Sequence, residues 1–170
     1  MTAYLNGEFL PLEEARISPL DRGFLFGDGV YEVIPVYSRR PFRIAEHLRR
    51  LQDSLDGIRL PNPLTAAGWQ DVVERLVAAA DFPDQSVYLQ VTRGADDKRD
   101  QAFPVGVAPT VFAFTAPLLA PSEALCASGV AAITVPDIRW AKCDLKAVSL
   151  LANVLLRQQA ADAGCTEAVM

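Results

Sequence analysis

Segments with a strand-like and a helix-like hydrophobic pattern follow one another along the whole chain, and this order restricts the fold more than any other feature. Strand-like runs of apolar and β-branched residues cover 4–10, 30–37, 86–93, 110–115 and 129–135. Apolar residues recur every three to four positions in the longer stretches 44–55, 65–80 and 149–163. The first pattern is typical of strands and the second of amphipathic helices. The sequence therefore predicts a mixed α/β (α+β) fold.

Turn residues separate these elements and suggest where the chain divides. Asn6-Gly7 accepts the positive φ angles of a tight hairpin turn, so 4–10 is expected to be a hairpin. Pro117 and Pro121 interrupt both helix and sheet pairing. We therefore expect an N-terminal α/β domain over 1–116, a linker over 117–122 and the start of a second domain over 123–170. A cleft between two such domains is a common ligand site.

Composition excludes several classes of protein. The 170 residues carry a net charge of −5, which argues against a nucleic-acid binder because phosphate contacts need surplus Lys and Arg. No apolar run reaches the roughly 20 residues of a membrane span, so a cytoplasmic protein with no membrane contact is expected. Three widely spaced cysteines indicate neither a disulfide framework nor a zinc site, and no metal is expected. Any histidine chemistry would have to use His47, the one histidine.

Lys146 is the most informative single residue. It lies between the β-branched strand 129–135 and the apolar helix 149–163, beside Leu145 and Val148. A lysine among apolar residues loses its proton more easily than a solvated one and can then attack a carbonyl cofactor. Taken alone, however, the segment favours a surface lysine at a helix start.

Other segments have a chemical and a structural interpretation. The glycine-rich stretch 21–32 lacks the lysine and the following helix of a phosphate loop, so a turn is the simpler explanation. Tyr31 could donate to an anionic substrate or pack half-buried. Arg50 precedes the apolar position Leu51 and could hold a phosphate or extend into water. His47 is expected to be a core or interface histidine, and the charged loop 94–101 to be solvated surface or a substrate loop.

Together these segments resemble the fold-type IV pyridoxal-phosphate enzymes, most closely the D-amino-acid transaminase branch of the class IV aminotransferases. The matching residues are 21–24 (Asp-Arg-Gly-Phe), 26–33 (Phe-Gly-Asp-Gly-Val-Tyr-Glu-Val), 46–48 (Glu-His-Leu), 50–51 (Arg-Leu), 91–94 (Val-Thr-Arg-Gly), 137–140 (Asp-Ile-Arg-Trp) and 142–146 (Lys-Cys-Asp-Leu-Lys). The set extends over nearly the whole chain, which makes it specific. In this fold, residues 123–170 would begin the cofactor-binding domain.

The resemblance implies a homodimer that binds pyridoxal 5'-phosphate and moves an amino group between a D-amino acid, such as D-alanine, and a 2-oxo acid, such as 2-oxoglutarate. Lys146 would carry the cofactor as a Schiff base and shuttle the proton between the substrate α-carbon and the cofactor C4′. Arg50 would hold the cofactor phosphate, and Arg139 would lie near the cofactor 3-hydroxyl. Tyr31 would help bind the substrate α-carboxylate, which Arg99 would reach from the partner subunit.

Two departures from the family pattern bear on this expectation. Gln101 stands where many D-amino-acid transaminases have a histidine, so the carboxylate is expected to be held more weakly or differently. Family members also continue beyond the point where residue 170 stands, and the glutamate that pairs with the pyridine nitrogen would lie there. We therefore expect the chain to be an N-terminal portion that is inactive in isolation.

Three alternatives remain open from the sequence. Two keep the fold, namely a branched-chain L-aminotransferase and an aminodeoxychorismate lyase, and the residues of 21–33 favour the D-type enzyme over both. The third is a non-catalytic remnant that retains only dimerisation or cofactor binding.

Overall fold

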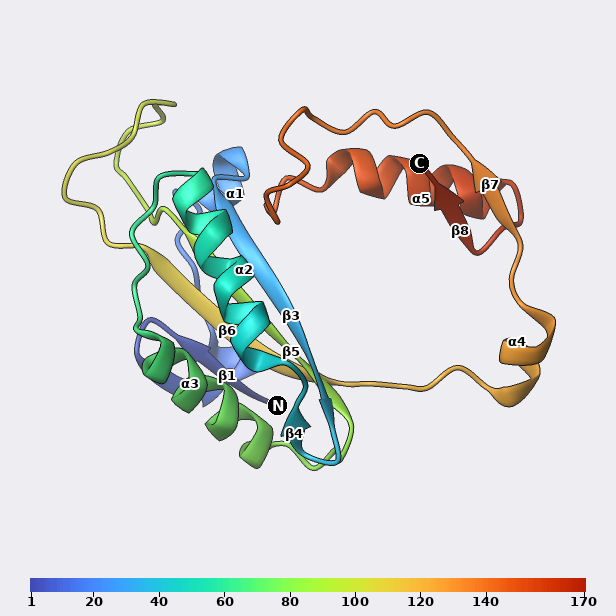
Figure 1. The fold of residues 1–170 in the computed structure, drawn as a ribbon. Helices are drawn as coiled ribbons and strands as arrows, with labels where there is room; N and C mark the ends of the chain where they lie inside the picture. The colour runs from blue at the N-terminus through green and yellow to red at the C-terminus, as the bar shows by residue number, and fades with distance from the viewer. The chain divides into compact units, whose positions relative to one another are not determined.

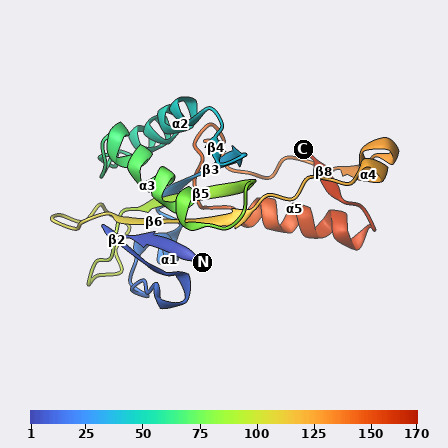
Figure 2. The same cartoon turned by 90° about the horizontal axis from the view of Figure 1, so that it is seen from below.

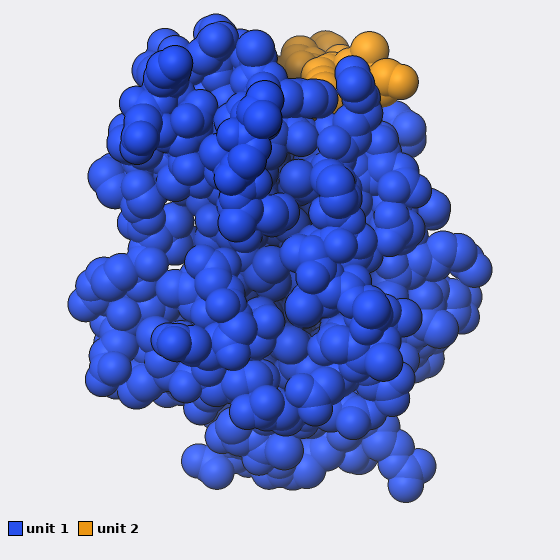
Figure 3. All heavy atoms as spheres, turned by 90° about the vertical axis from the view of Figure 1, so that its left-hand side faces the viewer, with its two compact units in different colours: residues 1–119, 144–149 blue, residues 120–143, 150–170 orange.

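The computed structural model describes residues 1–170 and divides into two compact units, which are coloured separately in Figure 3. Unit 1 comprises 1–119 and 144–149, and unit 2 comprises 120–143 and 150–170. The first break, between 119 and 120, falls within the proline-containing segment 117–122. The return of 144–149 to unit 1 has no signal in the sequence pattern. Whether the two units correspond to domains 1–116 and 123–170 stays a prediction.

Unit 1 is built on a six-stranded antiparallel sheet (Figure 1). In the order β2-β1-β6-β5-β3-β4, the strands are β2 (Glu8–Pro11), β1 (Thr2–Leu5), β6 (Thr110–Pro117), β5 (Gln85–Thr92), β3 (Gly29–Tyr37) and β4 (Arg40–Pro41). Asn6 and Gly7 connect β1 to β2 with φ angles of 50° and 104°, as the Asn-Gly pair predicts. The mixed α/β fold expected from the sequence is confirmed.

Two amphipathic helices, α2 (Ile44–Gly57) and α3 (Ala66–Ala79), cover one face of this sheet (Figure 2). Thr65 begins α3, because its hydroxyl accepts a hydrogen bond of 3.1 Å from the Gly68 backbone N–H. Apolar residues from both helices pack with the inward residues of the strands. This core includes Ile34, Val36, Leu51, Leu55, Trp69, Val73, Leu76, Val87 and Leu89. Both helices match the expected stretches 44–55 and 65–80.

The opposite face of the sheet is aromatic. Tyr31 stacks on Tyr88 with 5.7 Å between ring centres, and Tyr88 in turn contacts Phe114 at 5.4 Å. Because side chains alternate between the faces of a strand, Tyr31 points away from the helices while its neighbour Glu32 points toward them.

Short elements complete unit 1. The sequence pattern did not predict α1 (Arg22–Phe26) or the 3₁₀ turn η1 (Leu12–Glu14). Asp21 caps α1 by accepting a 2.8 Å hydrogen bond from the Gly23 backbone N–H, and Gly27 ends the helix in the left-handed conformation with φ of 67°.

Unit 2 contains α4 (Glu123–Ser128), β7 (Ala132–Thr134), α5 (Leu151–Asp162) and β8 (Glu167–Val169). The strands β7 and β8 pair in parallel, with Ile133 opposite Ala168. The expected strand 129–135 is therefore shorter in the structure, and α4 was not expected. None of the helices in the structure has the length and apolar character needed to cross a bilayer.

Candidate functional site

The backbone of 146–148 pairs with the edge of β3 and so fixes the position of Lys146 in unit 1. The Lys146 carbonyl accepts a 3.0 Å hydrogen bond from the Tyr31 N–H, and the Val148 N–H donates to the Gly29 carbonyl at 3.0 Å. The Lys146 N–H donates to the Ser54 hydroxyl of α2 at 3.2 Å. Lys146 thus lies where β3 and α2 meet.

The end of α2 approaches this segment closely. A side chain at Gly57 would place its Cβ 2.3 Å from Leu145 Cδ2, well inside van der Waals contact. The absence of a side chain at Gly57 therefore leaves room for Leu145, the residue before Lys146.

The amine of Lys146 lies over an aromatic ring. Its Nζ is 4.0 Å from the centre of the Tyr31 ring, and the residue is half-buried. A cation over a ring face is attracted by the ring quadrupole. Behind this ring, burial and the nearby Tyr31 raise the pKa of Tyr88 to about 12. The Tyr88 hydroxyl donates to Gln90 Oε1 at 2.7 Å, so Tyr88 acts as a neutral donor there.

Arg50 reaches the same region from α2 and is held by a carboxylate that the strand buries completely. Arg50 Nη2 donates to Glu32 Oε2 at 2.8 Å, Arg50 Nε donates to Oε1, and His47 Nδ1 lies 2.9 Å from Oε2. Burial alone would raise the pKa of the Glu32 carboxyl, but these hydrogen bonds hold it below its usual value. Hydrogen bonding to Glu32 likewise raises the pKa of Arg50.

The Arg50 guanidinium keeps an accessible side in spite of this ion pair. Its side chain is 52% exposed, and the contacts to Glu32 use Nε and Nη2. Nη1 and the outer edge of the group therefore remain available to an anion. His47 is half-buried and lies between Glu32 and Arg50, which agrees with the expectation of a core or interface histidine.

A pocket of about 460 Å³ opens on the aromatic side of the sheet near this site. It is lined by Ile17, Ser18, Pro19, Asp21, Gly23, Phe24, Gln90, Thr92 and Val148. Gln90 is the direct cross-strand neighbour of Tyr31, and Val148 lies two residues after Lys146. The pocket therefore borders the residues that carry the candidate chemistry.

Two of the expected site residues are not gathered around Lys146 in unit 1. Arg139 belongs to unit 2, where its Nε and Nη2 donate to the Asp137 carboxylate at 3.0 and 2.7 Å. The hydrogen bonds from Arg139 lower the pKa of Asp137 to about 2. Arg99 is exposed in the loop 95–109 between β5 and β6, with its guanidinium carbon 5.3 Å from the Phe26 ring centre.

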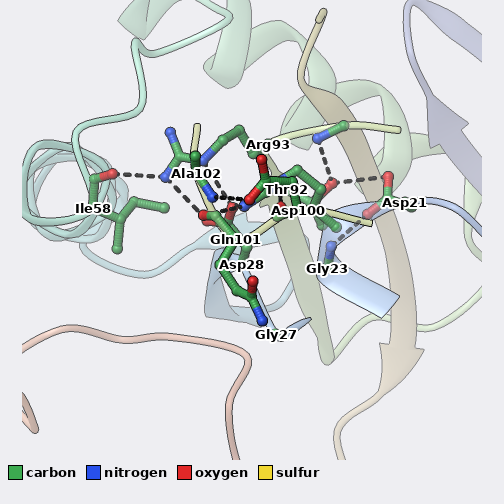
Figure 4. Close-up of polar contacts among 12 residues, drawn as sticks. Asp21, Gly23, Gly27, Asp28, Ile58, Thr92, Arg93, Asp100, Gln101 and Ala102 are labelled. Atoms are coloured by element: carbon green, nitrogen blue, oxygen red, sulfur yellow. Dashed lines mark hydrogen bonds and ion pairs between the residues drawn. The ribbon is translucent and has the colours of Figure 1, made fainter. Parts of the chain in front are cut away.

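A second charged cluster lies at the base of the 95–109 loop (Figure 4). The sequence pattern did not predict it as part of the site. Arg22 and Arg93 both donate to the Asp28 carboxylate, at 2.8 Å from Nε in each case. Each of the three residues belongs to a matched motif, but nothing in the order of the sequence pairs them. For Glu32 a signal did exist, because an acidic residue occupies a core-facing position of the predicted strand 30–37.

The chain is similar in sequence to known enzymes along most of its length. Residues 29–170 match the family model described as amino-transferase class IV. A D-alanine aminotransferase from Staphylococcus epidermidis is 40% identical over 167 residues, which are 98% of this chain and 58% of that protein. A D-alanine aminotransferase from Bacillus licheniformis is 37% identical over 170 residues, 100% of this chain and 59% of that protein. The chain thus spans somewhat over half the length of these relatives.

Solved structures share the fold. A branched-chain amino acid aminotransferase solved with pyridoxamine 5'-phosphate superposes with a TM-score of 0.91 over 99% of this chain and 58% of its own, at 22% identity. A branched-chain aminotransferase from Thermoproteus uzoniensis, solved with norvaline, has a TM-score of 0.83 at 26% identity and covers 100% of this chain and 59% of its own.

Proposed function

Because the chain belongs to the class IV aminotransferase family, we propose that it serves a pyridoxal-phosphate-dependent exchange of an amino group between a D-amino acid, such as D-alanine, and a 2-oxo acid, such as 2-oxoglutarate. The observation that carries this proposal is the position of Lys146, whose amine lies over the Tyr31 ring while its backbone N–H donates to Ser54 of α2, the helix that carries Arg50. The 37–40% identity to D-alanine aminotransferases favours D-substrates. The likeness to the branched-chain enzyme solved with pyridoxamine 5'-phosphate, at 22% identity, concerns the fold.

The residues of unit 1 have the chemistry that pyridoxal 5'-phosphate requires. Lys146 offers a primary amine for the aldehyde carbon, and the open edge of Arg50 offers N–H donors for the phosphate. Arg139 is the proposed neighbour of the 3-hydroxyl. When bound, the cofactor supplies a conjugated ring that takes up the electrons of the broken Cα–H bond.

The side chains then bind the substrate and move its proton. Tyr31 donates its hydroxyl to the α-carboxylate, and Arg99 binds the same group in a homodimer, from one subunit to the site of the other. Lys146 Nζ carries the proton between the substrate α-carbon and the cofactor C4′. The amino group leaves the first substrate as its 2-oxo acid is released, and the second 2-oxo acid receives it.

Covalent labelling tests this proposal directly, because the sequence contains only three lysines, Lys98, Lys142 and Lys146. Protein mixed with pyridoxal 5'-phosphate and reduced with borohydride should carry one pyridoxyl group on Lys146, as located by peptide mass spectrometry. Lys146→Met should abolish this label, whereas the exposed control Lys142→Met should keep it. Label spread evenly over all three lysines, or no label at all, would contradict the proposal.

Because the 170 residues are expected to be inactive in isolation, substrate assays on a protein that continues past residue 170 to the length of the relatives separate the alternatives. D-alanine with 2-oxoglutarate should turn over faster than L-leucine with 2-oxoglutarate, and aminodeoxychorismate should not be cleaved. A preference for L-leucine would identify a branched-chain enzyme, and cleavage of aminodeoxychorismate would identify a lyase. A Lys146 label without turnover of any substrate would identify a cofactor-binding remnant.

A further inference from the structure

We propose that Arg22, Asp28 and Arg93 form a buried anchor that positions the 95–109 loop, and with it Arg99, for binding of the substrate carboxylate. The use of the loop for substrate rests on the proposed function, whereas the anchoring itself rests on contacts within unit 1. Arg22, Asp28 and Arg93 are positioning residues in this proposal, because they act on the loop and not on the substrate.

The anchor begins with a carboxylate shared by two arginines. Asp28 Oδ2 accepts from Arg22 Nε and from Arg93 Nε, both at 2.8 Å, and Oδ1 accepts from Arg93 Nη2 at 3.0 Å. Arg22 is 2% and Arg93 is 6% exposed. Burial alone would raise the pKa of Asp28, but the hydrogen bonds from Arg93 and Arg22 hold it below its usual value, so the carboxylate is ionised.

The charges of this cluster do not balance among themselves. Two guanidinium groups share one carboxylate, and a buried positive charge without partners is strongly unfavourable. The remaining N–H groups are satisfied by backbone carbonyl oxygens of two loops. Arg22 donates to the carbonyls of Asp100 and Gln101. Arg93 Nη2 donates to the carbonyl of Ile58 at 2.8 Å (Figure 4).

The carbonyls that satisfy Arg22 belong to the two residues directly after Arg99. Arg22 Nη2 is 3.1 Å from the Gln101 carbonyl oxygen, and Nη1 makes the shorter bond to Asp100. Displacement of this stretch would therefore leave a buried guanidinium without its acceptors. The free energy that keeps Arg22 satisfied also keeps Arg99 in place.

Further contacts hold the start and the middle of the loop to the same cluster. The Arg22 N–H donates to the Gly94 carbonyl at 2.8 Å, at the start of the loop. Arg93 lies over the ring of Phe103, with 3.8 Å from its guanidinium carbon to the ring centre. Between these points the loop is exposed, and Arg99 is free to reach solvent or a partner.

Arginine is required at position 22 by this geometry. Its planar group donates in three directions at once, to one carboxylate and two carbonyls, whereas a lysine ammonium is a compact point charge on a flexible stem. Arg22→Lys keeps the charge but cannot reproduce the three bonds. The matched control is Arg75→Lys on α3, where the guanidinium stacks on Phe9 and pairs with Asp71, away from the loop.

The test combines hydrogen exchange with kinetics on a cofactor-loaded protein that continues past residue 170 to the length of the relatives. In Arg22→Lys the Ala102 amide, which donates to Asp100 Oδ1, should exchange about tenfold faster. The KM for D-alanine should rise about tenfold with kcat little changed, because a misplaced binding group weakens substrate capture. The pyridoxyl label on Lys146 should stay at the wild-type level. Arg75→Lys should match wild type in all three measurements.

A second variant, Phe103→Ala, keeps the proposal testable if Arg22→Lys does not fold. Phe103→Ala removes the contact with Arg93 from a half-exposed position and should produce the same two changes more weakly. Unchanged exchange in both variants would overturn the anchor, and faster exchange with an unchanged KM would overturn its role in substrate binding. Absence of turnover in a protein that continues past residue 170 to the length of the relatives would refute the proposed function, while the exchange experiment still decides the anchor.

Discussion

At the residue scale, the most consequential interaction of the candidate site is the Glu32–Arg50 pair. Glu32 is completely buried, while Arg50 is half-exposed, so the two partners depend on each other unequally. The carboxylate needs Arg50 and His47 to remain ionised in the core. Arg50 needs the carboxylate to fix the direction in which its open edge points. Glu32 therefore orients the edge of Arg50 that we propose as the phosphate-binding edge.

Glu32→Gln should reduce the free energy of unfolding by about 2 kcal/mol, because an amide satisfies Arg50 and His47 less well than a carboxylate does. The same variant should bind pyridoxal 5'-phosphate more weakly. Urea unfolding and titration of the Lys146 label measure the two effects. The control Glu46→Gln removes an exposed pair with Arg43 and should leave stability nearly unchanged, because solvent screens such a pair.

The effect of Glu32→Gln should also depend on pH. The pKa of Glu32 is lowered in the folded state, so its stabilising contribution is complete above the ordinary glutamate value of about 4.3. The contribution is lost as the pH falls through the lower, folded pKa. The stability difference between wild type and Glu32→Gln should therefore be constant near neutral pH and shrink in acid. A difference that grew in acid would contradict this assignment.

Individual residues were predictable from the sequence to different degrees. Lys146, Arg50 and Tyr31 were found through motifs, and the structure brings them together in unit 1, although their roles stay proposals. Arg22, Asp28 and Arg93 also belong to matched motifs, and Arg22 lies only six residues before Asp28, but the bond from Arg93 to Asp28 joins positions 65 residues apart. No periodicity reveals such a pairing, because it depends on how the chain between them folds.

At the scale of elements, the long strands and helices of unit 1 follow the hydrophobic pattern closely, whereas the short ones do not. The helices α1 and α4 have too few turns to show a period, and local capping by Asp21 and Ser122 decides them. The helix expected over 149–163 begins at Leu151. Ser149 instead donates its hydroxyl to the Gly27 carbonyl at the end of α1, at 3.0 Å.

The close approach of α2 to Leu145 gives a prediction at this scale. Gly57→Ala should shift the position of Lys146, because the new methyl group must displace the side chain of the preceding residue, Leu145. Pyridoxyl labelling of Lys146 should fall several-fold, although alanine favours the helix by about 1 kcal/mol. Gly68→Ala in α3 is the matched control. Its methyl group would meet ordinary contacts at 3.5 Å, so stability should rise while labelling remains unchanged.

Equal labelling of both glycine variants would show that Leu145 yields without moving Lys146. A loss of labelling in Gly68→Ala would show that labelling reports the stability of the whole unit instead of the position of Lys146. Thermal unfolding of the two variants separates these outcomes.

At the scale of the whole molecule, the two units differ in how much structure supports each strand. In unit 1, β5 lies between β3 and β6 and forms hydrogen bonds with both. Its inward residues Gln85, Val87, Leu89 and Val91 are buried. In unit 2, β7 and β8 have only each other as partners, and Ala132, Thr134, Glu167 and Val169 are exposed. The hydrophobic pattern does not indicate this difference, because it depends on the number of paired strands.

Local opening should therefore cost far less free energy in unit 2 than in unit 1. Amides of β7 and β8 should exchange with solvent at least about a hundredfold faster than those of β5, since strands with one partner and little burial open without disrupting a core. Peptide-resolved hydrogen exchange on the 170-residue chain measures this ratio. Equal protection of β5 and the β7–β8 pair would mean that further contacts support unit 2. Such contacts would also have to cover Leu151, Val154 and Leu155, the exposed apolar residues of α5.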